Sequence, residues 1–222
     1  MVPRRIHQFW DRPAPPDEVV ERMRTWPAHH PQWRYTVWND ISANVFIEDT
    51  FGVEAATCFR ACTIAAMRAD LFRIAAMVAI GGLYADADIA RNGSAAALSA
   101  TSCTLYYSIG RESGRVKLRN SFIVASPGHI LFAKALDQAL FNIRHKPLEN
   151  NISRMTGPIL LTGIWHKHLS NDERTSVRLL TGAEVREYFG RAGRMNYHRS
   201  EGHWTEQSKL GPLVDFNRAS GG

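Results

Sequence analysis

The feature that most constrains this chain is a pair of acidic residues, Asp86 and Asp88, at the end of an apolar segment. Residues 71–80 are rich in Ala, Leu, Ile and Met and lack Gly and Pro, which favours a helix. The glycine pair 81–82 then supplies the backbone freedom that ends a helix. From residue 83 to 89 the side chains alternate, which predicts a strand with both carboxylates on one face.

Two acids on the same face of a strand need a physical reason. Asp is depleted in strands, and like charges on neighbouring same-face positions repel each other. A hard divalent cation removes this repulsion, since Mg²⁺ and Mn²⁺ prefer carboxylate oxygens and leave positions that phosphate oxygens fill. The alternative is a solvent-facing strand end with two hydrated acids, which the triplet alone does not exclude.

The surroundings of the triplet resemble the donor-site signature of glycosyltransferase family 32. This signature has a small residue, Asp, Leu, a variable position and Arg, then an apolar helix, Gly-Gly, an apolar residue, Tyr and D-x-D. Residues 69–88 keep each of these features, with Ala85 and Ala87 where bulkier apolar residues are more usual. The family is related to clostridial glucosylating toxins and to yeast-type initiating mannosyltransferases. The resemblance implies the GT-A fold.

The remaining sequence alternates between predicted strands and helices. This α/β pattern, with D-x-D at a strand end, predicts a mostly parallel central sheet flanked by helices and a ligand crevice at the strand ends. Strands are expected over 5–10, 33–40, 104–109 and 120–125, helices over 17–26, parts of 41–59, about 60 into the signature, 130–143 and 182–189, and loops over 27–31, 111–119 and 170–175.

Composition limits the classes of protein. A chain of 222 residues is expected to form a single domain, residues 1–222, with a loose tail from about residue 207. The net charge of +6 favours anionic partners, but no recognition motif supports nucleic acid. Three irregularly spaced cysteines favour a reducing, cytoplasmic location. Without a signal-peptide core or an apolar run of roughly 20 residues, membrane contact is expected to be peripheral.

The resemblance assigns roles to five residues of the signature. Asp70 is expected to hydrogen-bond the hydroxyls of the donor sugar, and Arg73 to contact the sugar or the diphosphate. Their spacing of three places them on one helix face, where a surface ion pair is the simpler explanation. Asp88 is the expected metal ligand, with Asp86 as a second ligand or a contact to the ribose. Tyr84 belongs to the same donor-binding set.

Other matches lie outside the signature. Trp10 corresponds to a tryptophan that stacks on the nucleotide base, although a core Trp closing the first strand is the alternative. Asn120 falls in a strand that lines the donor pocket. Near the C-terminus the resemblance implies that His198 completes the metal shell and that Trp204 closes over the donor, with His203 as the alternative to His198.

Together these residues imply a retaining, metal-dependent hexosyltransferase that uses a UDP- or GDP-sugar with Mn²⁺ or Mg²⁺. The acceptor would be a glycan, a lipid-linked saccharide or a protein, and bacterial surface polysaccharide synthesis is the expected context. No carboxylate is placed as a covalent nucleophile, since Asp70 is assigned to sugar binding, so front-face displacement is the preferred mechanism. The alternative is a nucleotide-sugar-binding protein without catalytic activity.

Overall fold

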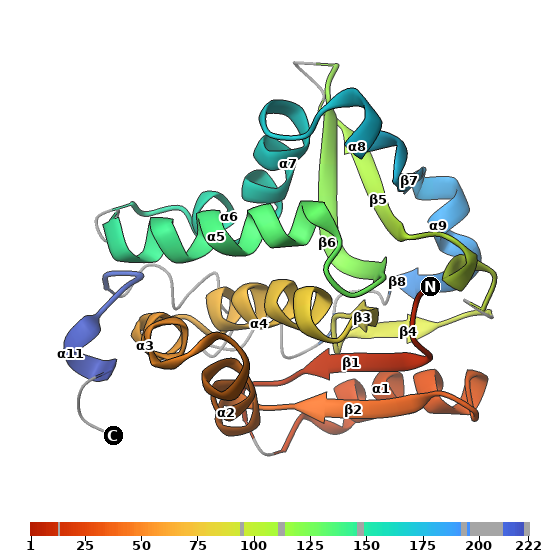
Figure 1. The fold of residues 1–222 in the computed structure, drawn as a ribbon. Helices are drawn as coiled ribbons and strands as arrows, with labels where there is room; N and C mark the ends of the chain where they lie inside the picture. Colours follow the sequence, from red (N-terminus) through yellow and green to blue (C-terminus); the bar gives the residue numbers. More distant parts are fainter. Residues whose placement is uncertain are drawn as a thin grey trace.

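The computed structural model describes residues 1–12, 14–93, 96–110, 114–145, 149–191, 195 and 211–219. Six strands form a central sheet in the order β2-β1-β3-β6-β5-β7 (Figure 1). Five of them run in the same direction and β6 alone is antiparallel to its neighbours, which confirms the predicted mostly parallel sheet. The strands are β1 Arg5–Phe9, β2 Arg34–Trp38, β3 Gly82–Ala85, β5 Cys103–Ile109, β6 Val116–Ala125 and β7 Val177–Leu180.

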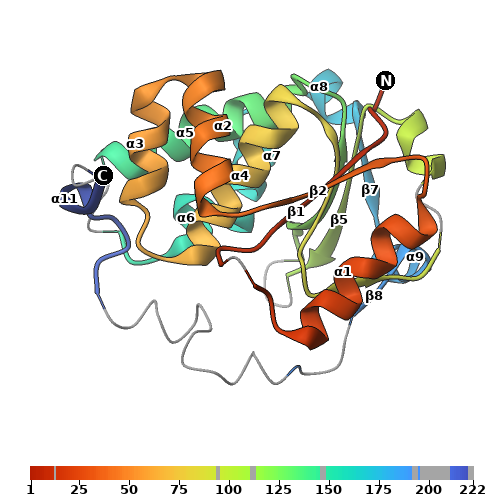
Figure 2. The same cartoon turned by 90° about the horizontal axis from the view of Figure 1, so that it is seen from below.

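Two layers cover the faces of this sheet, as the view in Figure 2 shows. One layer contains α2 Asp40–Phe51, α3 Val53–Ala61, α4 Ala65–Ala79, α5 Ile130–His145, α6 Ile152–Met155 and α7 Pro158–Lys167. The opposite layer contains α1 Asp17–His29, the short 3₁₀ helix Ala96–Ala100, α9 Gly182–Tyr188 and a small sheet of β4 Ile89–Arg91 and β8 Phe189–Arg191. In the part of the chain with assigned structure, no helix is both long and apolar enough to cross a bilayer.

Side chains of one strand separate into these two layers by simple alternation. On β6, Ile123 packs with the layer of α4 and α5, whereas Phe122 and Val124 pack with the layer of α1 and α9. All four residues of β3 are buried, as expected for a strand covered on both faces.

Helix α4 is the core helix of the larger layer. Every residue from Met67 to Met77 is buried, including Arg68, Asp70 and Arg73. A helix that is apolar on all sides belongs inside a protein. Charged side chains in such a helix must be paired, because an isolated buried charge is strongly unfavourable.

The turn after α4 reverses the chain, so that β3 enters the sheet directly after this helix. Gly81 and Gly82 have φ of 66° and 102°, values that L-amino acids with a side chain rarely adopt. A Cβ atom on Gly82 would lie 2.6 Å from the carbonyl oxygen of Arg5, so β3 can approach β1 only with glycine here. The predicted glycine break therefore sets the register of α4 against β3.

Several local predictions were wrong. The strand expected over 83–89 ends at Ala85, and residues 86–88 form a turn. The expected loop at 27–31 is partly helical, because α1 continues through Pro27 to His29 around the fully buried Trp26. The helix expected from about residue 60 begins later, at Ala65 of α4. The loop expected over 170–175 contains α8 Asn171–Thr175 behind a capping box at Ser170.

The C-terminal segment 211–219 packs on the helical layer and contains α11 Phe216–Ala219. Thr63 donates its backbone N–H to the carbonyl of Leu213 at 3.0 Å, and Cys62 forms a β-bridge with Val214. The expectation of a loose tail from about residue 207 therefore does not hold for these residues.

His7 joins three parts of the sheet region. The indole N–H of Trp38 donates to Nδ1 of His7 at 3.1 Å, so the ring proton resides on Nε2, which donates to the carbonyl of Gly81 at 3.1 Å. Only 2% of His7 is exposed. Burial lowers the pKa of His7 to about 4, and the nearby charges of Arg5 and Arg34 act in the same direction.

This histidine predicts a pH-dependent stability. The unfolded state binds a proton below about pH 6.5, whereas the folded state does so only near pH 4, so stability should fall as pH decreases through this window. The loss attributable to His7 is at most about 3 kcal/mol. Urea unfolding at pH 7 and pH 5 should show a smaller pH effect in His7→Asn than in the unsubstituted protein. An equal pH effect in both proteins would contradict this assignment.

Candidate active site

A cavity of about 550 Å³ opens beside the acidic turn that follows β3. Its volume lies within the range of pockets that hold small molecules. Its walls come from α4, the turn, β6, the segment before and within α6, and the first residue of α7. The lining residues are Ala66, Asp70, Arg73, Asp86, Arg119, Asn120, Asn150, Asn151, Ile152, Ser153 and Pro158.

A large bulge in β6 forms one wall. Leu105 of β5 pairs with Ile123, but the next residue, Tyr106, pairs with Arg119, so residues 120–122 have no partner on β5. Two backbone carbonyls in this segment accept hydrogen bonds from active-site residues instead. The carbonyl of Asn120 accepts a hydrogen bond from Nη1 of Arg73 at 2.8 Å, and the carbonyl of Ser121 accepts from the backbone N–H of Asp86 at 2.9 Å.

Asp70 is the most enclosed acid of the site, with 6% of its surface exposed. Its Oδ1 accepts a hydrogen bond from Nδ2 of Asn120 at 2.8 Å and lies 3.4 Å from Nη2 of Arg73. The hydroxyl of Thr156 donates to Oδ2 at 3.3 Å. Burial raises the pKa of Asp70, while Arg73 and the two hydrogen bonds oppose that rise. The predicted ion pair exists, but in the interior rather than on the surface.

Arg73 bridges the two acids of the site. The same Nη2 lies 3.1 Å from Oδ1 of Asp86, and the guanidinium carbon lies 4.6 Å from the ring centre of Tyr84. Burial by itself would lower the pKa of Arg73, but the charges of Asp86, Tyr84 and Asp70 give a net increase. Arg73 is therefore a permanent cation between two carboxylates.

Asp86 is the more accessible acid, with 31% of its side chain exposed. Desolvation raises its pKa to about 7, and the charges of Asp88 and Asp70 add to this, against the effects of Arg73 and the Tyr84 hydroxyl. Asp86, whose charge the neighbouring Asp88 disfavours, lies beside an open cavity and is a suitable ligand for a hard divalent cation. Within the described ranges, no three His, Cys, Asp or Glu residues form a metal cluster, so a cation here would need further ligands.

The structure brings four predicted site residues together on one cavity wall: Asp70, Arg73, Asp86 and Asn120. Tyr84 lies beneath them, 1% exposed, and its hydroxyl donates to Oδ1 of Asp86 at 3.1 Å. It therefore positions Asp86 and does not line the cavity.

Two other predicted residues do not line this cavity, and three further ones cannot be placed in it. Asp88 lies in the turn but is not a lining residue, and Trp10 packs with the cluster of Val19, Met23, Ala87 and Met195 in the layer of α1. Its role as a base platform stays a prediction. His198, His203 and Trp204 lie outside the residues that the structure describes.

Comparison with known families agrees with this geometry. Residues 16–105, from α1 to β5, match a family model described as a glycosyltransferase sugar-binding region containing a DXD motif. Residues 16–105 are therefore similar to a DXD-type sugar-binding region. The match includes Asp70, Arg73 and the acidic turn of the DXD motif, whereas Arg119, Asn120 and Thr156 lie beyond it.

Similar proteins are known in two yeasts. The chain is 26% identical over 170 residues to inositol phosphoceramide mannosyltransferase 2 of Schizosaccharomyces pombe, covering 76% of this chain and 47% of that protein. It is 25% identical over 194 residues to mannosyl phosphorylinositol ceramide synthase CSH1 of Saccharomyces cerevisiae, covering 84% and 49%. The chain thus spans about half the length of the curated relatives it matches.

A solved structure supports the GT-A fold. The PaToxG glycosyltransferase superposes with a TM-score of 0.62 at 13% sequence identity, covering 96% of this chain and 89% of that one. At this identity the likeness concerns the fold alone. The fold class predicted from the sequence is confirmed.

Several wall residues were missed by the sequence reasoning. Thr156 lies just before α7, and the hydrogen bond from its hydroxyl to Asp70 was not predicted. Arg119 and the polar residues of 150–153 reach the DXD region only through the fold. No periodic or motif signal marks them.

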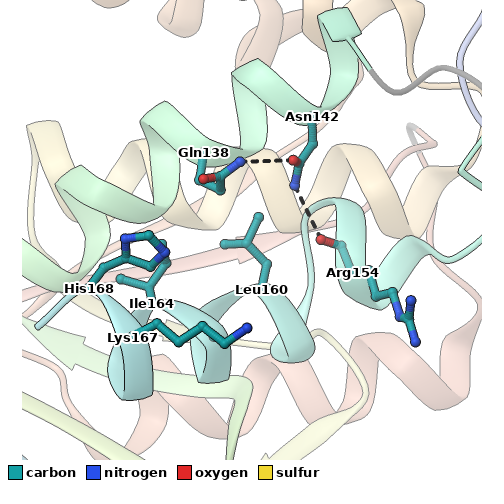
Figure 3. Close-up of a pocket in the computed structure, with 8 residues that line it drawn as sticks. Gln138, Asn142, Arg154, Leu160, Ile164, Lys167 and His168 are labelled. Carbon is teal, nitrogen blue, oxygen red and sulfur yellow. Dashed lines mark hydrogen bonds between the residues drawn. The ribbon is translucent and has the colours of Figure 1, made fainter.

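A second cavity, of about 270 Å³, lies between α5, α6 and α7 (Figure 3). Asn142 projects from α5 and its Nδ2 donates to the carbonyls of Arg154 and Met155 at 3.3 and 3.1 Å, while its Oδ1 accepts from Gln138 at 2.9 Å. These bonds hold the end of α6 one residue before Thr156. Helix α6 thus lies between the two cavities. By holding the end of α6, Asn142 also positions Thr156, which bonds to Asp70 although it lies outside the DXD region.

Because Gly157 lies close to Asp70 and Ser153, a side chain at this position should reduce the stability of the protein. A Cβ atom there would lie 2.9 Å from Oδ2 of Asp70 and 2.9 Å from Cα of Ser153, so Gly157→Ala should destabilise the protein by about 1–3 kcal/mol through overpacking. The matched control is Gly163→Ala in α7, where nothing lies within 4 Å and helix propensity should add up to about 1 kcal/mol. Denaturant unfolding measures both, and equal stability of the two variants would refute the tight contact.

Proposed function

We propose that this protein transfers a hexose from a UDP- or GDP-sugar to a hydroxyl group of an acceptor, with the help of Mn²⁺ or Mg²⁺. The observation that carries the proposal is the buried bridge of Asp70, Arg73 and Asp86 in the wall of an open cavity beside the DXD turn. The relatives named as mannosyltransferase and mannosyl-transferring synthase favour sugar transfer over other uses of a nucleotide.

The donor sugar is proposed to lie against the buried wall of the cavity. Oδ2 of Asp70 accepts a hydrogen bond from Thr156, and a carboxylate oxygen has two lone pairs, so acceptor capacity remains for a sugar hydroxyl. The nucleotide is proposed to extend toward Trp10, in the layer of α1, while Arg73 faces the boundary between sugar and diphosphate. A guanidinium is well suited to phosphate oxygens because its geometry permits two parallel bonds.

Asp86 and Asp88 are proposed to hold the divalent cation. When bound, such a cation stabilises the negative charge that develops on the leaving nucleoside diphosphate. The protein's own part is to fix Asp86 through the Tyr84 hydroxyl and the backbone carbonyl of Ser121 before the substrate arrives. His198 stays a predicted further ligand.

Retention of configuration by front-face displacement is the proposed mechanism. Asp70 is a poor candidate for a covalent nucleophile, because it is 6% exposed and is held by Asn120, Thr156 and Arg73. A displacement in which the leaving phosphate accepts the proton of the attacking hydroxyl needs no protein nucleophile. Mass spectrometry that finds a glycosyl adduct on Asp70 would refute this part of the proposal.

The acceptor is proposed to be a glycan, a lipid-linked saccharide or a protein, and the two yeast relatives favour the lipid-linked class. Those relatives are eukaryotic and give no support to a role in bacterial surface polysaccharide synthesis. The net charge of +6 is compatible with peripheral contact to an anionic membrane surface in the cytoplasm.

The proposal predicts that the DXD acids are essential for release of the nucleotide. Asp86→Asn and Asp88→Asn should each reduce Mn²⁺-dependent hydrolysis of UDP- or GDP-sugars by about 100-fold or more, because charge stabilisation of the leaving group is lost. EDTA should have the same effect on the unsubstituted protein. Hydrolysis is measured as released UDP or GDP over a panel of donors.

The control is Asp137→Asn, an exposed acid on α5, which should leave hydrolysis unchanged. Thermal stability of each variant separates loss of function from loss of fold. Stabilisation by a donor with Mn²⁺ but without hydrolysis would favour the non-catalytic alternative. Absence of both would refute the proposed function.

A further inference from the structure

The turn that carries the two acids of the DXD motif is closed by one backbone carbonyl. The carbonyl of Asp86 accepts the backbone N–H of Ile89 at 3.1 Å, so residues 86–89 form a four-residue turn with Asp88 at its third position. The geometry of this turn sets how the two carboxylates lie relative to each other. A group that holds the carbonyl of Asp86 therefore influences the placement of both proposed metal ligands.

A second donor reaches the same carbonyl from β1. Gln8 is 0% exposed, and its Nε2 donates to the carbonyl of Asp86 at 3.2 Å. Strand β1 lies between β2 and β3 (Figure 1), and its pairing with β3 ends at His7 and Tyr84, just before Gln8. The side chain of Gln8 thus joins β1 to the turn at the point where the pairing of the two strands stops.

The hydroxyl of Tyr35 fixes the orientation of this amide. It donates to Oε1 of Gln8 at 2.6 Å from the neighbouring strand β2. A carbonyl can only accept, so the amide nitrogen of Gln8 must face Asp86 and its oxygen must face Tyr35. Burial raises the pKa of Tyr35, so the hydroxyl keeps the proton that it donates. These three residues form a chain of hydrogen bonds that runs from β2 through β1 to the acidic turn.

Asp86 is held from both faces of the sheet. The hydroxyl of Tyr84 donates to its carboxylate from the layer of α4. Gln8 is bonded instead to Tyr35, which packs with the layer of α1 and α9. The side chain and the backbone of Asp86 are therefore fixed by separate contacts, and only the contact of Gln8 acts on the turn itself.

We propose that Gln8 is a positioning residue for the metal site, which holds the turn so that Asp86 and Asp88 bind the divalent cation together, and that Tyr35 orients it. This inference rests on the proposed function and adds two residues outside the acidic turn that set the metal affinity. Gln8 does not line the cavity, so it acts through the backbone of Asp86. Groups that orient the ligands of a metal strongly affect its affinity.

A buried polar side chain on a strand can also serve only to stabilise the sheet, and His7 illustrates that case. It precedes Gln8 on β1 and is 2% exposed. Its ring bonds to Trp38 and to the carbonyl of Gly81, just before the start of β3, and not to the acidic turn at the other end of that strand. His7 is accordingly the matched control.

The test measures the dissociation constant of Mn²⁺ from the electron paramagnetic resonance signal of the free ion, without nucleotide and then with UDP or GDP against a nucleotide blank. Gln8→Met keeps the length of the side chain but removes the donor, and should weaken Mn²⁺ binding by about 10- to 100-fold. Tyr35→Phe should weaken it less, because Gln8 keeps its donor but loses its orientation. His7→Asn should leave it unchanged, although urea unfolding should show that His7→Asn and Gln8→Met both lower stability.

Unchanged Mn²⁺ affinity in Gln8→Met, or an equal loss in His7→Asn, would overturn the inference. Tyr35→Phe should cause no further loss when it is added to Gln8→Met, and a further loss of the same size would overturn the role of Tyr35. Tyr35→Phe is also the milder variant, so unchanged affinity there decides against the inference if Gln8→Met does not fold. Failure of the unsubstituted protein to bind Mn²⁺ in any titration would instead refute the metal-dependent function, and the inference with it.

Discussion

The structure depends on one buried cation, the guanidinium of Arg73, held between the carboxylates of Asp70 and Asp86. Removing one member of such a buried set costs about 3–5 kcal/mol, because the remaining charges stay out of water without a partner. The bridge therefore forms only if α4, the end of β3 and the bulge of β6 occupy their places together. Assembly of the site therefore requires the native arrangement of these three elements.

The elements around the bridge have complementary roles. The glycine pair 81–82 returns the chain from α4 to β3, and the ring of Tyr84 supports the guanidinium from below. Asn120 contributes its side chain to one acid and its carbonyl to Arg73, so the bulge couples both. This preorganisation suits a transferase, because dipoles and charges already in position need no reorganisation when the leaving group develops charge.

The residues that line the cavity differ in how far the protein itself satisfies their polar groups. Asp70, Arg73 and Asn120 are buried and bonded to one another, which fixes their geometry. Arg119 and Asn150 are exposed. Helix α6, held from behind by Asn142, forms the wall between this cavity and its smaller neighbour.

The sequence by itself determined the α/β class, the helix, glycine pair and strand at 65–85, and the DXD residues, because these depend on local composition and periodicity. Only the tertiary structure decided that β3 ends at Ala85, that the Asp70–Arg73 pair is buried, and that residues 120–122 of β6 have no partner on β5. A bulge depends on pairing between strands that are far apart in the sequence. The burial of a side chain depends on which other elements pack against it. Neither is encoded in the neighbours of a residue along the chain, and so Thr156 and Arg119 reached the site without a sequence signal.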